Sequence, residues 1–340
     1  MKAVTMDKPL LYFNEIAHAC DYDAGLERTE TQRFASQGQL KLLIGELFFL
    51  DCLHQKSLLA GSTVVYIGSA PGKHIRYLVE HFKTLDVRVR WVLVDGRAHD
   101  ASLRGVSDVS IVTRFVDDRY LAKLRQVLRD ARVVLISDIR SKRGSGEPAT
   151  EDLLRDYALQ NSMVDILKPV AFSLKWRCPF PDQWLRNFYM PCGREMLQPF
   201  APTFSAEMRL LNVGEREPLR LRCITLDAAR EYERRMFYLN SVVRRRIILN
   251  FDYPNQEYDF FHMFHLLNTA TFPLEFQSVK KKVLFLQQSI IRFLDIRLPP
   301  VDRVQHEPPQ RKLSGKNTVP QSRGQQKPVR RRTKGGTGQV

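Results

Sequence analysis

The sequence predicts an α/β chain built on a mostly parallel, Rossmann-like sheet of seven strands, with helices on both faces. First, an apolar β-branched run over Thr63–Ile67 stops at Gly68, turns, and restarts after Gly72 with helical periodicity. This is the strand, turn and helix start of a doubly wound sheet. Second, continuously apolar runs recur with helical patterns between them, as expected for parallel strands covered on both faces. Third, the last two runs lie close together without a full helix between them, which predicts a late antiparallel hairpin.

The elements follow in order from their patterns. Residues 1–35 are irregular, with scattered aromatic residues. Apolar residues at helical spacing predict a helix over Gln37–His54. The predicted strands are Val64–Ile67, Val89–Val94, Val109–Val112, Val133–Ser137, Val170–Lys175, Met208–Val213 and Leu219–Thr225. We expect the last two of these strands to form the hairpin.

Helical patterns continue beyond the predicted sheet, around Ala228–Val243, Tyr258–Leu267 and Val283–Leu294. Residues 301–340 are rich in Pro, Gly, Gln, Ser, Lys and Arg and almost free of large apolar groups. They cannot bury enough surface to offset the entropy of ordering, so we expect them to be disordered. We therefore assign residues 1–300 to a single domain with helical additions at both ends, and residues 301–340 to a basic tail.

The charge balance indicates a polyanionic partner. There are 53 Lys and Arg against 37 Asp and Glu, a formal net charge of +16. Residues 301–340 hold ten basic and two acidic residues, so half of this charge lies in the tail and half in the body. A basic body as well as a basic tail favours RNA or DNA. The five scattered cysteines fit neither a disulfide framework nor a zinc site and suggest a reducing compartment. No apolar run is long enough for a membrane span, so no membrane is expected.

The turn Gly68-Ser-Ala-Pro-Gly72 limits the classes of ligand that the sheet is expected to bind. It lacks the second glycine of the G-x-G-x-x-G dinucleotide fingerprint. A turn ending in Pro-Gly favours a smaller ligand without phosphates, such as S-adenosylmethionine. Asp95 closes the next strand, 23 residues beyond Gly72, where an acid can accept two hydrogen bonds from a ribose diol. An ordinary strand-to-helix turn and a solvated acid are the alternatives.

Further charged residues lie at strand ends around the same crevice. Asp138 ends one apolar strand and Lys175 ends the next, so the two side chains can touch. Glu207 precedes a later strand, and Lys41 projects from the first long helix. Each could be a solvated surface charge, but the set of four is more specific than any of its members.

This order of Lys41, Asp138, Lys175 and Glu207 around a glycine turn resembles the Lys-Asp-Lys-Glu tetrad of RNA ribose 2′-O-methyltransferases, which have a Rossmann-like methyltransferase fold. Longer segments resemble one group of that family, the cap-specific mRNA methyltransferases of poxviruses. These segments are Gln37-Gly-Gln-Leu-Lys-Leu-Leu43, Gly45-Glu-Leu-Phe-Phe49, Ser173-Leu-Lys-Trp-Arg-Cys-Pro-Phe-Pro-Asp182, Gln198-Pro-Phe-Ala-Pro202 and Asn250-Phe-Asp-Tyr-Pro-Asn-Gln-Glu-Tyr258. The resemblance covers residues 1–310 and falls away in the tail.

The resemblance implies an enzyme that transfers a methyl group from S-adenosylmethionine to the ribose 2′-hydroxyl of the first transcribed nucleotide of capped mRNA. Lys175 would be the general base or the group that steers the attacking oxygen, aided by Lys41, Asp138 and Glu207. The implied cofactor-binding residues are Gln39, Tyr66, Gly68, Gly72, Asp95, Arg97, Val116 and Asp138. No metal is required.

The resemblance also implies a site for the cationic 7-methylguanosine base. Stacking between the rings of Tyr22 and Phe180 would hold the base, and the carboxylates of Asp182 and Glu233 would accept its hydrogen bonds. The remaining implied cap and RNA contacts are Arg33, Arg177, Ser205, Ala206 and Glu207. Position 204 is Phe where relatives are expected to have Tyr, so a hydroxyl contact is missing while ring packing can persist. Basic residues at 140, 142, 143 and 209 are candidates for tracking RNA phosphates.

Partners follow from the same resemblance. The family implies a heterodimer with the catalytic subunit of a viral poly(A) polymerase, in which this chain is the regulatory subunit, and a role in transcription elongation. It implies a location in the virion and the host-cell cytoplasm. The alternative is a non-catalytic RNA-binding processivity subunit with a vestigial methyltransferase fold. A nicotinamide-dependent oxidoreductase is disfavoured by the missing fingerprint and by the charge balance.

Overall fold

A computed structural model describes residues 5–26, 34–141, 148–202, 204–214, 220–246, 248–249, 255 and 257–297. The predicted tail and the residues Arg33, Lys142 and Arg143 lie outside the described residues. None of the described helices combines the length and the apolar character that a bilayer-spanning segment needs.

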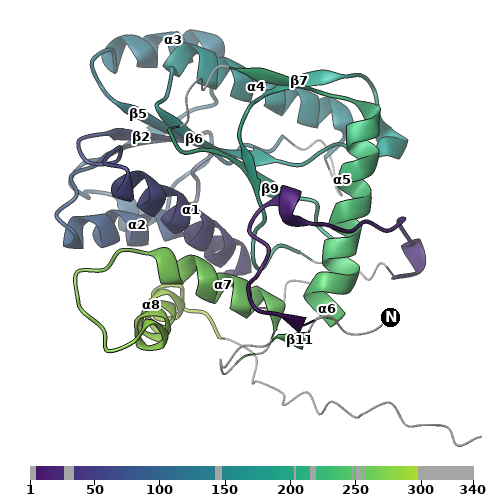
Figure 1. Ribbon diagram of the computed structural model, residues 1–340. Coiled ribbons are helices and arrows are strands. Elements are labelled where there is room, and N and C mark those ends of the chain that lie inside the picture. The colour runs from purple at the N-terminus through teal and green to yellow at the C-terminus, as the bar shows by residue number, and fades with distance from the viewer. Residues whose placement is uncertain are drawn as a thin grey trace, which may run out of the picture. The chain divides into compact units, whose positions relative to one another are not determined.

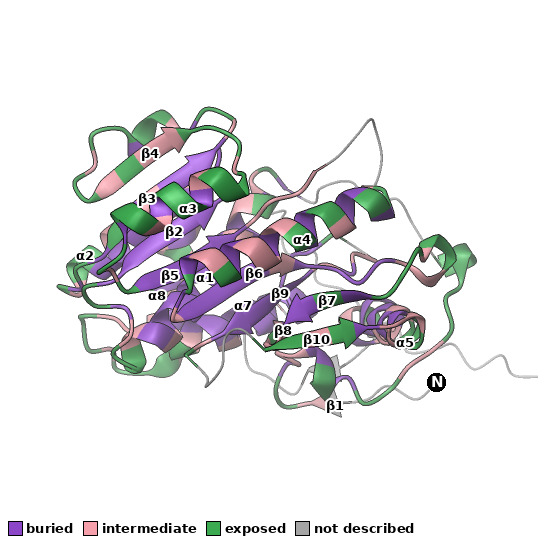
Figure 2. Cartoon of the chain, turned by 90° about the horizontal axis from the view of Figure 1, so that it is seen from above, coloured by how far each residue is buried: buried purple, intermediate pink, exposed green. Residues whose placement is uncertain are grey.

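The described residues contain a seven-stranded sheet in the order β4-β3-β2-β5-β6-β9-β8 (Figures 1 and 2). Its strands are β2 (Thr63–Ile67), β3 (Arg90–Asp95), β4 (Val109–Thr113), β5 (Val133–Ser137), β6 (Ala171–Trp176), β8 (Arg194–Met196) and β9 (Met208–Asn212). The strands from β2 to β6 pair in parallel, and β9 is antiparallel to both of its neighbours. The predicted mostly parallel α/β sheet is confirmed.

Helices cover both faces of this sheet, because its central strands are apolar on both sides. The helices are α1 (Gln37–Gln55), α2 (Lys73–Thr84), α3 (Asp118–Val127), α4 (Thr150–Leu167), α5 (Leu226–Tyr238), α6 (Arg244–Arg246), α7 (Tyr258–Thr269) and α8 (Val279–Leu294). Along β2, Val64 and Tyr66 pack into a core with α1, α2, α7 and α8, whereas Val65 and Ile67 pack into a second core with α3, α4 and α5. Figure 2 shows the resulting burial of the central strands and the greater exposure of the edge strand β4.

The predicted hairpin is wrong in its partners. The expected last strand forms β10 (Leu221–Ile224), which pairs with β7 (Phe188–Pro191) in a separate two-stranded sheet. The antiparallel partner of β9 within the main sheet is instead β8. This three-residue strand is too short to be read from hydrophobic pattern. Gly193 precedes it, and a Cβ there would lie 2.6 Å from the carbonyl oxygen of Leu211, so the close approach of the two strands requires glycine.

The predicted helices are confirmed, with one difference at the end of α5. The pattern over Ala228–Val243 predicts one helix, but α5 ends at Tyr238 and the chain continues as a π-helical turn over Leu239–Val243. The strands β1 (Thr5–Met6) and β11 (Ile248–Leu249) form a further parallel pair, which joins the N-terminal segment to the chain between α6 and α7.

Gly61 and Gly68, on either side of β2, both have left-handed backbone, but only Gly68 is packed closely against other backbone. Gly61 and Gly68 have φ angles of 73° and 81°, but a Cβ at Gly61 meets nothing within 4 Å, whereas one at Gly68 would lie 2.8 Å from the backbone carbon of Asp138. We expect Gly61→Ala to lower the free energy of unfolding by about 1–2 kcal/mol, the cost of that backbone for an L-residue. Gly68→Ala should cost about 3 kcal/mol or more, because the added methyl group also displaces backbone. Urea unfolding measures both values, and equal losses would show that the turn can move away from Asp138.

Candidate active site

Four parallel strands deliver the predicted site residues to one edge of the sheet. Gly68, Asp95, Asp138 and Lys175 end or directly follow β2, β3, β5 and β6. Carboxyl ends of parallel strands meet at a single edge, which is where ligands of doubly wound sheets bind. The structure therefore brings the predicted cofactor turn and two of the predicted tetrad residues together.

The turn after β2 lies against the chain that follows β5. A Cβ on Gly68 would lie 2.8 Å from both the backbone carbon of Asp138 and the backbone nitrogen of Ile139. Gly72, with a φ of 71°, precedes α2, and a Cβ there would lie 2.5 Å from the carbonyl oxygen of Ser69. Both glycines are required by this close packing, which leaves the turn narrow and without side chains at its two ends.

The Asp95 carboxylate is placed to accept hydrogen bonds at this edge. Its Oδ2 accepts from the Ala70 backbone N–H at 3.0 Å, and its Oδ1 accepts from the backbone N–H of Arg97 at 2.8 Å. The guanidinium of Arg97 donates to both oxygens, at 3.0 and 3.1 Å. Burial raises the pKa of Asp95, but the hydrogen bonds from Arg97 and Ala70 outweigh it and hold this pKa below its usual value. The side chain of Arg97 is largely exposed, so it can leave Asp95 when a ligand hydroxyl takes its place.

The four predicted tetrad residues are in contact. Lys175 Nζ lies 3.3 Å from Asp138 Oδ1 and 3.3 Å from Glu207 Oε2. Lys41 Nζ, from α1, forms an ion pair with Glu207 Oε1. Because β9 runs antiparallel to β6, the residues that precede β9 arrive at the same edge as the end of β6, and Glu207 therefore meets Lys175.

Arg209 is a buried cation that pairs with the tetrad residue Asp138, so the prediction that it tracks RNA phosphates is wrong. It is 2% exposed and donates to Asp138 Oδ1 at 2.8 Å and to the Ser137 carbonyl oxygen at 2.9 Å. Burial raises the pKa of Glu207, but Lys41 and Lys175 outweigh it and hold this pKa well below its usual range. Burial also raises the pKa of Asp138, but Lys175 and Arg209 lower it by more, so this pKa lies below its usual value.

Two residues behind the tetrad were not predicted as part of the site. Glu46 of α1 accepts a hydrogen bond from the Tyr66 hydroxyl at 2.6 Å, and its Oε2 lies 3.1 Å from His74 Nε2. His74 Nδ1 lies 2.8 Å from Gln39 Oε1, so Gln39 and Tyr66, both predicted cofactor residues, belong to one buried network. Burial, followed by the charge of Glu46, raises the pKa of Tyr66 well above its usual value. The sequence signal that could have identified Glu46 is the presence of an acidic residue within the apolar run of α1.

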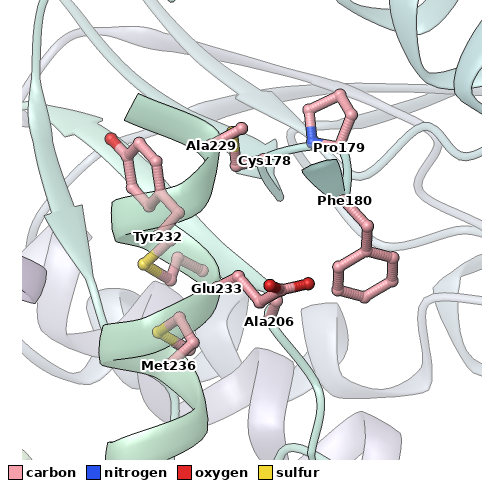
Figure 3. A pocket seen from close by; sticks show the side chains of 9 residues that line it. Cys178, Pro179, Phe180, Ala206, Ala229, Tyr232, Glu233 and Met236 are labelled. Atoms are coloured by element: carbon pink, nitrogen blue, oxygen red, sulfur yellow. The ribbon is translucent and has the colours of Figure 1, made fainter. Parts of the chain in front are cut away.

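A pocket beside the tetrad contains several of the predicted cap-binding residues. It is lined by Cys178, Pro179, Phe180, Ala206, Met208, Ala229, Tyr232, Glu233 and Met236 (Figure 3). In Figure 3 the Glu233 carboxylate points from α5 toward the ring of Phe180. The Arg177 guanidinium lies over that ring, 4.7 Å from its centroid. Burial and the nearby charge of Asp182 raise the pKa of Glu233.

Tyr22 approaches the same helix from the N-terminal segment. Its ring is 47% exposed and contacts Phe237 of α5 edge-on at 5.3 Å, one residue from the pocket-lining Met236. Phe204 also packs on Phe237, with the two rings stacked and their centroids 5.7 Å apart. The ring packing expected at position 204 is therefore present without a hydroxyl group. The sandwich of a base between Tyr22 and Phe180 stays a prediction.

The other predicted residues within the described part of the chain are Ser205, Arg140 and Val116. The Ser205 hydroxyl accepts from the Glu207 backbone N–H at 3.2 Å, and Arg140 approaches Glu207 Oε2 at 4.0 Å. Val116 follows β4 and is partly buried. Its neighbour Phe115 is 82% exposed, and a Cβ on Gly96 would meet the Phe115 ring at 2.5 Å.

Comparison with known proteins gives close relatives. The family model of the poly A polymerase regulatory subunit matches residues 5–296. A cap-specific mRNA (nucleoside-2′-O-)-methyltransferase from Myxoma virus (strain Lausanne) is 54% identical over 330 residues, which cover 97% of this chain and 98% of that protein. The protein of the same name from Fowlpox virus (strain NVSL) is 55% identical over 300 residues, covering 87% and 97%. Among solved structures, a putative ribosomal RNA methyltransferase from Plasmodium falciparum matches 53% of this chain and 96% of its own at 14% identity and a TM-score of 0.31.

The buried ion pairs of Glu207 predict a pH-dependent loss of stability. Glu207→Gln leaves Lys41 and Lys175 short of one carboxylate, and breaking a buried pair in this way costs about 3 kcal/mol of unfolding free energy at neutral pH. Because the pKa of Glu207 lies below its usual value of 4.5 in the folded protein, this stabilisation is complete above that value and is lost as the pH falls through the lower, folded pKa. Urea unfolding of both proteins from about pH 7 to about pH 3 measures the difference, which should shrink in acid. A difference that does not change with pH would contradict the ion-pair assignment.

Proposed function

The chain belongs to the poly(A) polymerase regulatory subunit family, and on this basis we propose that it transfers a methyl group from S-adenosylmethionine to the ribose 2′-hydroxyl of the first transcribed nucleotide of 7-methylguanosine-capped mRNA. The observation that carries the proposal is Lys175, held between Asp138 and Glu207 beside the turn that begins at Gly68. The names of the relatives from Myxoma and Fowlpox viruses support the same activity.

The residues at the sheet edge fit S-adenosylmethionine. Asp95 supplies carboxylate oxygens at the end of β3, where a ribose diol is accepted once the exposed Arg97 side chain moves away. The Gly68–Gly72 turn has no cation of its own to hold a pyrophosphate, which suits a nucleoside cofactor without phosphates. When bound, the sulfonium cofactor supplies an electrophilic methyl group.

Lys175 orients the nucleophile in this proposal. An ammonium group has three N–H donors, and the carboxylates of Asp138 and Glu207 account for two directions. In the proposal a ribose 2′-oxygen takes the third direction, and Lys175 holds it for in-line attack. Lys41 and Arg209 keep the two carboxylates ionised, so the position of Lys175 is set by charge as well as by packing.

The pocket on α5 suits the cationic base of the cap. Phe180 supplies an aromatic face, and Glu233, with Asp182 beside it, supplies carboxylates for the guanine edge. Burial and the neighbouring charge of Asp182 both disfavour the ionised form of Glu233 and so raise its pKa. A positively charged base therefore improves its environment.

We also propose the regulatory role for which the family is named, as a partner of a poly(A) polymerase catalytic subunit. The match of the family model over residues 5–296 supports it. A role in transcription elongation, and location in the virion and host-cell cytoplasm, belong to the same proposal through the family resemblance. A vestigial methyltransferase fold is disfavoured, because such a site has no need to retain the full set of ion pairs around Lys175.

Lys175→Ala tests the enzymatic role. The variant keeps Asp138 paired with Arg209 and Glu207 paired with Lys41, so it should fold. We expect methyl transfer from labelled S-adenosylmethionine to capped RNA to fall by a factor of about 100 or more, since an orienting and proton-handling group is lost. Cofactor and RNA affinity should change little.

A matched control is Lys123→Ala, which removes an exposed lysine from α3. It should retain the wild-type rate. Mapping the methylated ribose identifies the acceptor, and full activity of the Lys175 variant would remove the proposed mechanism. Lys175→Ala should still support tail extension by the polymerase catalytic subunit, which separates the two roles.

Phe180→Ala tests the cap pocket. Loss of one stacking face should weaken binding of capped RNA by about 5- to 100-fold, because base stacking on an aromatic side chain contributes about 1–3 kcal/mol. Binding of uncapped oligo(U) or oligo(A) should not change. Fluorescence anisotropy with capped and uncapped RNA of the same sequence makes the comparison, and an equal loss on both would assign Phe180 a structural role.

A further inference from the structure

A group of aromatic and basic side chains lies on α8 and on the segment that precedes it, outside the site described above. The rings of Phe272, Phe276 and Phe285 contact one another, with centroids 5.4 to 5.5 Å apart. Phe285 is 45% exposed despite these contacts. With Lys281 and Arg292 of the same helix, these three residues are called the α8 patch.

The three α8 residues of the patch, Lys281, Phe285 and Arg292, lie on the side of the helix that faces away from the core. The residues Val283, Leu286, Ile290 and Leu294 are buried and join the core that α8 shares with α1, α2 and α7. The opposite stripe consists of Lys281, Phe285, Gln288 and Arg292, which are all exposed and are spaced by four, three and four residues. Figure 1 shows α8 beside α7, on the outer side of the α1–α2 layer.

This stripe places a cation on either side of an exposed aromatic ring. Lys281 and Arg292 are eleven residues apart, about 16 Å along a helix, with Phe285 between them. A platform for a base with cations before and after it is the arrangement by which proteins bind single-stranded nucleic acid without reading its sequence.

The first turn of α8 is unusually basic for a helix start. Three consecutive lysines follow Val279, and no acidic residue lies in this turn. Lysines at the positive end of a helix dipole are unfavourable for the helix. Lys282 donates to the carbonyl oxygen of Asn268 at 2.8 Å, and the exposed Lys281 donates to the side-chain oxygen of the exposed Gln277. The helix start therefore carries a positive potential that an anionic partner would relieve.

We propose that the α8 patch binds single-stranded RNA, with a base stacked on Phe285 and phosphates held by Lys281 and Arg292. The excess of cations favours a polyanion over an apolar protein surface. The patch lies on a different helix from the cap pocket, which is formed in part by α5. The proposal concerns RNA away from the cap and does not rest on methyl transfer.

The test measures binding of fluorescein-labelled, uncapped oligo(U) to the full chain by anisotropy at several salt concentrations. Phe285→Ala should weaken binding by about 5- to 100-fold through the lost stacking contact. The double variant Lys281→Gln, Arg292→Gln should reduce the slope of log affinity against log salt by about 1.4, or about 0.7 for each phosphate contact on a single strand.

Matched controls separate the patch from general charge. Tyr189→Ala removes an exposed aromatic ring from β7, and Arg119→Gln with Lys123→Gln removes two exposed cations from α3. These variants should bind oligo(U) as the wild type does. Thermal unfolding of every variant checks that the fold is retained, and the double charge variant keeps the test valid if Phe285→Ala unfolds.

A direct readout is photocrosslinking of RNA that carries 5-iodouridine, with the crosslinked peptide identified by mass spectrometry. Crosslinking at Phe285 supports the proposal. Wild-type affinity and salt slope in the patch variants would overturn it, as would equal losses in the controls. If RNA binding is unchanged while association with a poly(A) polymerase catalytic subunit is lost, the patch is a protein-docking surface and the proposal is wrong.

Discussion

The carboxylates of Asp138 and Glu207 are largely removed from water, and each must keep cationic partners to stay ionised. Those partners come from separate parts of the chain: Lys41 from α1, Lys175 from the end of β6 and Arg209 from β9. Removing one member of a buried ion pair leaves an uncompensated charge, which is far more costly than losing a surface pair. The ion pairs therefore fix α1, β6 and β9 relative to one another at the sheet edge where the chemistry is proposed to occur.

This constraint gives the reversed strand β9 a specific purpose in the site. A strand parallel to β6 in that position would bring its last residues to the edge, and Glu207 would lie at the opposite end of the sheet. Because β9 is antiparallel, Glu207 arrives at the edge from outside, and Arg209 follows in register beside Lys175. The sequence predicts that a late strand is antiparallel, but the pairing of β9 with β8 depends on three residues and on the close approach at Gly193, which hydrophobic pattern cannot show.

The parts of the site that could be predicted are those that follow strand ends. Gly68, Asp95, Asp138 and Lys175 each close an apolar run, and parallel topology alone brings them together. Lys41 and Glu207 stand out in the sequence only as charges near the crevice, and their catalytic role follows from the family resemblance, since neither lies at the end of a parallel strand. The network of Glu46 and His74 depends on which face of α1 meets the start of α2, and this is decided by packing. The charge of Arg209 predicts an RNA contact, but its place in a buried strand makes it a partner of Asp138 instead.

The segment from Ala206 to Arg209, at the start of β9 and just before it, contributes residues to both halves of the proposed site. Ala206 and Met208 line the pocket on α5, whereas Glu207 and Arg209 bind the tetrad residues on the other side. Met208 and Arg209 point to opposite faces because they are successive residues of a strand, and the four consecutive residues serve both the pocket and the ion pairs. Because Arg209 is buried and bonded to Asp138, this segment has little freedom to move. If the base and the ribose bind as proposed, this backbone sets the distance between them, which favours methylation at a fixed distance from the cap over methylation along the whole transcript.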